Sequence, residues 1–108
     1  MIEKLDNKSF NLFGEKYKIH FVDKIVCDDE PDKYEVYGLS HRGGKNCIKV
    51  ARTINNEEIS EDVKELTLYH ELLHAICDVG QYSSVSKDEP FIEWAAKCIF
   101  NLKKQGIL

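Results

Sequence analysis

Hydrophobic and polar residues alternate through much of the first half of the chain, a pattern typical of half-buried β-strands. The clearest example is residues 16–22, where Tyr17, Ile19 and Phe21 alternate with polar side chains. A shorter apolar run at residues 10–13 precedes it across a Gly-Glu dipeptide. We therefore predict a hairpin whose second arm is the strand at residues 16–22.

Two more strands are predicted before the pattern changes, at residues 34–39 and 45–52. The acidic segment 27–33 contains Pro31 and is expected to be a loop, and the Gly-rich stretch at residues 40–44 is expected to be a turn. If the strand at residues 45–52 forms an exposed edge of the sheet, its backbone could pair with an extended chain. The substrate would then be a peptide rather than a small molecule.

The second half of the chain has the longer hydrophobic period of α-helices. Ser60 is a suitable N-cap and Gly80 a natural stop, so we predict a helix from residue 61 to about residue 79. A loop is expected at residues 81–85, and a second helix from residue 86 to about residue 104. Strands followed by two helices predict one α+β domain, with a short antiparallel or mixed sheet packed on both helices.

The first predicted helix carries the sequence His-Glu-Leu-Leu-His at residues 70–74. Side chains four residues apart project from the same face of a helix, so His70 and His74 can bind one metal ion. Glu71 is rotated from His70 by about 100°, which leaves its carboxylate beside the metal rather than on it. Zinc would lower the pKa of a bound water to about 7, and Glu71 would accept its proton during attack on a carbonyl.

The same pattern can arise without a metal, because histidines on an apolar helix can be ordinary core residues. Two histidines and a glutamate are nevertheless costly to bury without a purpose. We therefore predict a Zn²⁺ site in which His70 and His74 are ligands and Glu71 is the general base.

A catalytic zinc site needs a third protein ligand and an open fourth position. Glu89 and Glu93 lie four residues apart at the start of the second predicted helix, and we favour Glu89 as the ligand. Glu93 would then hold one histidine through its free ring N–H. The alternative is that Glu89 belongs to a capping box, Ser86-x-x-Glu89.

Other polar residues are candidates for supporting roles. Asp78 lies one helical turn after His74 and could orient its ring, or it could be a solvated acid near the helix end. Tyr82, in the loop between the helices, is a candidate oxyanion donor. His20 and His41 are weaker candidates for a fourth ligand or an oxyanion donor.

Composition narrows the class of protein. The chain has 108 residues, 43% of them hydrophobic and 31% charged, and a net charge of −4, which argues against nucleic-acid binding as the main function. No apolar run has the length of a signal peptide or a membrane span, so we expect a cytoplasmic protein with no membrane association. The four cysteines include no C-x-x-C pair, and we expect them to be reduced thiols rather than zinc ligands.

The stretch Thr-Leu-Tyr-His-Glu-Leu-Leu-His-Ala-Ile at residues 67–76, followed by Glu89-x-x-Ile92-x-x-x-Ala96, resembles the small metallopeptidases of phages and mobile elements. These are similar to the ImmA/IrrE-type proteases and to minimal gluzincins. The resemblance covers residues 34–104. It includes the dipeptide Tyr37-Gly38, which precedes the strand predicted at residues 45–52. It implies a zincin-like fold in which the second helix supplies a glutamate ligand, and a regulatory protease with few protein substrates.

Two functions follow from these observations. The first is a zinc metallopeptidase that hydrolyses peptide bonds in a peptide or protein substrate, such as a repressor of a mobile element. The alternative is a non-catalytic protein that keeps the fold and the metal to bind a partner. Glu71 favours the enzyme, because a structural zinc site has no need of a base and fills all four positions with protein ligands.

Overall fold

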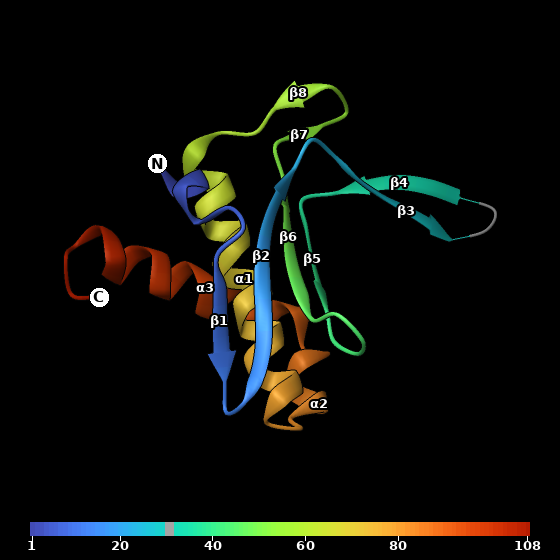
Figure 1. The fold of residues 1–108 in the computed structure, drawn as a ribbon. Coiled ribbons are helices and arrows are strands. Elements are labelled where there is room, and N and C mark those ends of the chain that lie inside the picture. The colour runs from blue at the N-terminus through green and yellow to red at the C-terminus, as the bar shows by residue number, and fades with distance from the viewer. Residues whose placement is uncertain (30–31) are drawn as a thin grey trace.

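The alternating run at residues 15–22 forms the longest strand of the protein, β2 (Glu15–Val22). A computed structural model describes residues 1–29 and 32–108 and shows an α+β architecture. β2 belongs to a four-stranded mixed sheet of order β1-β2-β6-β5. In Figure 1, α1 (Glu61–Val79) lies behind this sheet, and α3 (Glu89–Lys104) packs on α1 and extends past β1 at its C-terminal end. The other strands of the sheet are β1 (Ser9–Leu12), β5 (Gly38–His41) and β6 (Cys47–Ala51).

The pairing of the strands explains why the sheet is mixed. β1 and β2 form the predicted antiparallel hairpin, whereas β2 and β6 run parallel. β5 pairs with β6 antiparallel and forms the far edge. The 3-10 helix η1 (Ile2–Leu5) precedes β1, and a small hairpin of β7 (Thr53–Ile54) and β8 (Glu57–Glu58) follows β6.

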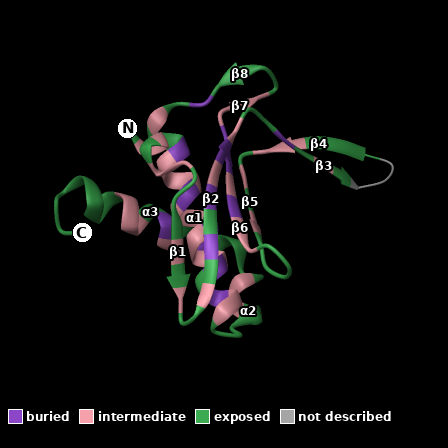
Figure 2. Cartoon of the chain, viewed as in Figure 1, coloured by how far each residue is buried: buried purple, intermediate pink, exposed green. Residues whose placement is uncertain are grey.

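The core lies between the sheet and α1 (Glu61–Val79). Tyr17, Ile19 and Phe21, the apolar positions of the predicted strand, are buried against Leu68 and Ala75 of the helix. Figure 2 shows the buried residues gathered along β2, β6 and the adjoining helix. The period-2 pattern of the strand therefore places its apolar face against the helix, as predicted.

The prediction of a loop at residues 27–33 is wrong. Most of that segment belongs to an antiparallel hairpin of β3 (Ile25–Asp29) and β4 (Asp32–Val36), which forms a separate two-stranded sheet. Ile25 pairs with Val36 at the buried end of the hairpin, and acidic residues occupy the outer end. The acidic side chains obscured the alternation, and Pro31, on which the prediction also relied, lies outside the described residues.

The single strand predicted at residues 34–39 is likewise two strands, β4 and β5, which belong to different sheets. The strand predicted at residues 45–52 is β6, but the proposal that it forms a sheet edge is wrong. β6 lies between β2 and β5, and its residues Ile48, Val50 and Ala51 are fully buried. Such a run of buried apolar residues is typical of an interior strand.

The helix predicted from residue 61 to residue 79 is confirmed as α1. The backbone N–H of Val63 donates to the Ser60 side chain at 3.2 Å, which is the expected N-cap. Gly80 follows the helix with φ of −78°, so it does not stop α1 by a left-handed conformation. A Cβ on Gly80 would instead lie 2.9 Å from the Tyr82 ring.

The second helix begins later than predicted. Residues 83–86 form a separate turn of helix, α2 (Ser83–Ser86), so the expected loop at residues 81–85 is partly helical. α3 (Glu89–Lys104) is capped by Asp88, which accepts a hydrogen bond from the Phe91 N–H at 3.2 Å. The capping box from Ser86 to Glu89 is therefore absent, because Asp88 occupies the N-cap.

A partly buried cluster of charged side chains around Glu3 joins the N-terminal segment to the rest of the fold. Glu3 Oε1 accepts from Arg52 Nε at 2.7 Å, and Glu3 Oε2 accepts from Lys64 Nζ at 2.5 Å. Lys64 is buried, and it also lies 3.4 Å from Glu61. The cluster ties η1 to the residue that follows β6 and to α1. Arg52 first, and Lys64 second, lower the pKa of Glu3.

We predict that Glu3→Gln lowers the free energy of unfolding at pH 7 by about 2 kcal/mol, because the buried Lys64 ammonium loses a partly buried, charged partner. The lowered pKa of Glu3 means that its contribution is present at neutral pH and is lost as the pH falls through the folded-state pKa. The difference between wild type and variant should therefore vanish in acid. Urea unfolding at several pH values measures it, with the exposed Glu58→Gln as control. A constant difference across the pH range would contradict the assignment.

Two further expectations concern the chain as a whole. All four cysteines are free in the structure. Within residues 1–29 and 32–108, no helix combines the length and the apolar character needed to cross a membrane.

Candidate metal centre

Three of the predicted site residues meet at one point where α1 and α3 approach each other. His70 Nε2 lies 3.1 Å from one carboxylate oxygen of Glu89, and His74 Nε2 lies 3.0 Å from the other. One ligand atom from each of the three residues lies within 4.8 Å of the other two. The spacing of four residues on α1 brings the histidines together, and the first turn of α3 supplies the glutamate.

The geometry and chemistry of this group fit a zinc ion. Tetrahedral zinc with ligands at about 2.0–2.1 Å holds its donor atoms roughly 3.3 Å apart. The ligand atoms of this group lie within 4.8 Å of one another, and the two short His–Glu distances join different oxygens of the carboxylate. Two imidazoles and a carboxylate are a donor set that zinc prefers. The side chains of His70 and His74 are 25% and 14% exposed, whereas that of Glu89 is 62% exposed. The two histidines are therefore largely enclosed by the protein, whereas Glu89 is accessible to solvent.

Glu71 lies beside the three residues but is not part of the group. It is buried, and this burial first, with the nearby charge of Glu89 second, raises its pKa to about 7. Its side chain is covered by β5 at Gly38. A Cβ on Gly38 would lie 2.9 Å from Glu71 Cγ and 2.6 Å from Thr67 Cγ2, so only glycine allows the strand to pass this close.

A chain of two hydrogen bonds holds the His74 ring through its Nδ1 atom. Its Nδ1 lies 2.9 Å from the Ser86 hydroxyl, which in turn donates to Asp78 Oδ1 at 3.1 Å. This arrangement suits a His74 tautomer in which Nδ1 carries the proton and Nε2 has a free lone pair. Asp78 therefore lies where it can orient His74, as one reading of the sequence suggested, but it acts through Ser86.

Ser86 is the residue that sequence reasoning missed. We considered it only as a helix cap, because a serine three residues before a glutamate has that signature. The usable signal was its place in the short connection between the two helices that carry the candidate ligands.

We predict that Ser86→Ala weakens zinc binding by about tenfold, because His74 loses the group that fixes its ring. Ser84→Ala, an exposed serine in the same short helix, is the matched control and should bind zinc as the wild type does. Competition with a chromogenic chelator measures both affinities. Equal affinities for the two variants would show that the Ser86 contact does not support the site.

The other predicted residues lie away from the ligand atoms. Glu93, expected to hold a histidine, instead pairs with Lys97 at 3.4 Å. Tyr82 is 65% exposed and packs beside Gly80, so nothing in its placement supports the role of oxyanion donor. His41 Nε2 contacts the Gly43 carbonyl at 3.0 Å, and His20 lies on β2. Among the described residues, the group of possible ligands consists of His70, His74 and Glu89, and neither His20 nor His41 belongs to it.

Two adjoining hollows flank His70 and Glu71. The first, of about 630 Å³, is polar and also contains Ser86 and Glu89. Residues 38–40 of β5 line one side of it. The second, of about 350 Å³, is largely apolar and is lined by Tyr37, Gly38, Val63, Leu66, Thr67, His70, Glu71, Glu93 and Ala96. The candidate centre therefore opens toward solvent between a polar and an apolar recess.

No family model, curated protein or solved structure matches this chain.

Proposed function

We propose that the protein is a zinc-dependent peptidase with a zincin-like fold. The convergence of His70, His74 and Glu89, with the buried carboxylate of Glu71 beside them, is the observation that carries this proposal. Zinc bound there would polarise a water molecule and a substrate carbonyl. Glu71 would accept the proton of the attacking water and transfer it to the leaving amine.

An enzyme accounts for Glu71 better than a structural metal site does. A structural zinc site has four protein ligands and no use for a buried acid next to them. Here the group offers three ligands, one of which is exposed, and the buried carboxylate of Glu71 lies beside them. A carboxylate in that place would be positioned to accept a proton from a metal-bound water.

The edge of the sheet favours an extended peptide as substrate. β5 is an edge strand, and its residues 38–40 line the polar hollow next to His70 and Glu71. The backbone groups on the outer side of an edge strand can pair with an added strand. We therefore propose that β5, rather than the strand at residues 45–52, pairs with the extended substrate. The apolar hollow beside Thr67 would accommodate a hydrophobic side chain next to the cleaved bond.

The resemblance to regulatory metallopeptidases of mobile elements suggests a narrow substrate range and a cytoplasmic location. The test is incubation of the zinc-loaded protein with a mixed peptide library, followed by mass spectrometry of the products. We expect cleavage at a few sequences with a hydrophobic residue beside the bond, and no cleavage by Glu71→Gln. A protein that binds zinc stoichiometrically but cleaves nothing in the library or in candidate protein substrates would favour the non-catalytic alternative.

A further inference from the structure

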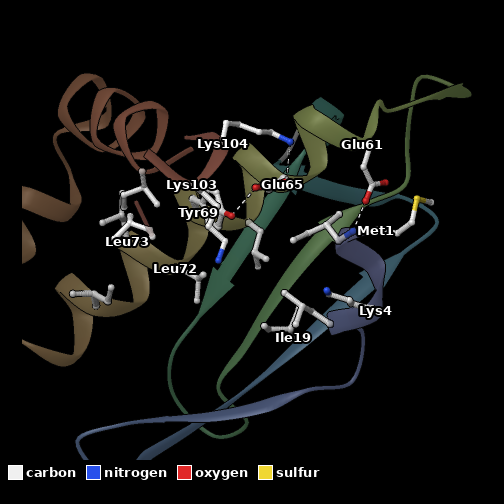
Figure 3. Close-up of a pocket in the computed structure, with 16 residues that line it drawn as sticks. Met1, Lys4, Ile19, Glu61, Glu65, Tyr69, Leu72, Leu73, Lys103 and Lys104 are labelled. Carbon is white, nitrogen blue, oxygen red and sulfur yellow. Dashed lines mark hydrogen bonds and ion pairs between the residues drawn. The ribbon is translucent and has the colours of Figure 1, made fainter. Parts of the chain in front are cut away.

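A third hollow, of about 670 Å³, lies along α1 and is drawn in Figure 3. Its lining positions on α1 lie on the opposite side of the helix from His70 and His74, by the helical period. It is bounded by η1, β2, α1 and the C-terminal half of α3. None of the residues that line it also lines either hollow beside Glu71. We call it the α1 groove. A molecule bound there would leave the metal centre uncovered.

The floor of the α1 groove is a helical stripe. Most of its lining side chains are apolar, and α1 contributes residues at intervals of three and four from Glu61 to Ile76. This stretch is about 22 Å long, or roughly four helical turns. The opposite walls are formed by Leu5 and Ile19 on one side and Ile99 on the other. A groove of this length with ridges at that spacing is suited to a packed α-helix.

The rims of the α1 groove are basic. Lys4 lies at the η1 side, and Lys103 and Lys104 lie at the α3 side, as Figure 3 shows. Lys104 pairs with Asp62 at 3.2 Å and Glu65 at 3.6 Å. Neither Lys4 nor Lys103 forms a salt bridge with an acidic side chain of the described residues.

The two acids in the α1 groove are already engaged within the protein. Glu61 accepts a hydrogen bond from the Ile2 N–H and lies 3.4 Å from Lys64. Glu65 accepts from the Tyr69 hydroxyl at 2.7 Å and lies 3.6 Å from Lys104. Because each acid has a lysine partner, the charge left unbalanced on the two rims is that of Lys4 and Lys103 and is positive. A ligand that complements it has an apolar centre and negative charge on both flanks.

We propose that the α1 groove binds an amphipathic α-helix of a partner protein, with acidic residues on both sides of its apolar stripe. A helix presents two such flanks at once, which matches lysines on opposite rims. A single-headed amphiphile such as a fatty acid would place its charge at one end only. This inference does not depend on the peptidase activity, because it uses none of the residues of the metal centre.

The test uses two synthetic helical peptides of about 18 residues, or five turns, with leucines at i, i+3, i+4 and i+7. One has glutamates on both flanks and the other has lysines. Fluorescence anisotropy with labelled peptides is expected to show saturable binding of the acidic peptide, at least about tenfold tighter than the basic one and weakened by salt. Chemical shifts of the Leu72 and Ile99 methyl groups should change on binding.

Three variants locate the interaction. Lys4→Glu combined with Lys103→Glu should reverse the preference between the two peptides. Ile76→Glu, at a residue that is 50% exposed and so tolerates substitution, should abolish binding of the acidic peptide. Lys45→Glu, an exposed lysine outside the groove, should behave as the wild type does. Circular dichroism establishes that each variant is folded.

The contrary outcomes are equally clear. Equal binding of both peptides, or no binding of either, would overturn the proposal. Saturable binding of laurate in place of the acidic peptide would assign the groove to a small amphiphile instead. Dimerisation of the wild type that Ile76→Glu abolishes, measured by light scattering, would assign it to a second copy of the chain.

Discussion

Glu71→Gln is expected to reduce peptide hydrolysis by about 10²–10⁴-fold while the protein continues to bind zinc. Glutamine has nearly the same shape as glutamate but cannot accept the proton of the attacking water. The side chain is buried beneath β5 and beside the ligands, so an isosteric change disturbs its surroundings little. The assay compares kcat on the best library substrate with the zinc content of the same preparations.

An exposed acid away from the candidate centre provides the control for this variant. Glu58→Gln changes a glutamate that lines none of the three hollows and should retain full activity. Retained hydrolysis in Glu71→Gln would rule out the proposed general base. Loss of zinc together with activity would mean that Glu71 is a ligand, which contradicts its placement beside the group.

Glu89→Ala is expected to weaken zinc binding by more than about 100-fold, because it removes one of the three ligands. The loss should exceed the 10–100-fold that removal of an outer-shell contact costs. Glu93→Ala, four residues further along α3, should change the affinity by less than about threefold. Chelator competition on both variants gives the comparison.

This pair of variants distinguishes the two glutamates that the sequence left open as ligands. The structure brings Glu89 to both histidines and pairs Glu93 with Lys97. Loss of zinc in Glu93→Ala alone would show that the assignment is wrong. Equal loss in both variants would require both carboxylates at the metal.

The sequence predicted the parts of the fold that depend on local patterns. The hairpin around β2 and the helix α1 follow from a clean period and from the Ser60 cap. The hairpin of β3 and β4 was missed because its outer residues are acidic and only the end near Ile25 is buried. The position of β6 within the sheet depends on a parallel pairing with β2 across 24 intervening residues (23–46), which no local pattern encodes.

In the candidate site, too, local spacing predicted some residues, whereas the positions of others depend on the fold. His70, Glu71 and His74 share one helix, so their spacing alone places them together. The approach of Glu89 depends on how α3 crosses α1, and the sequence could only offer it beside Glu93. For Ser86 the sequence offered only its place in the short connection between the helices, because its contact with His74 arises from the fold of that connection rather than from a spacing on one element.

The central claim is that this chain holds a zinc ion at its His-Glu-Leu-Leu-His helix. The most direct measurement is elemental analysis of the wild type and His74→Ala, each loaded with zinc and then passed through a desalting column. The account predicts about one zinc per chain in the wild type and essentially none in the variant. A wild type that retains no zinc, or a folded variant that retains as much as the wild type, would contradict it.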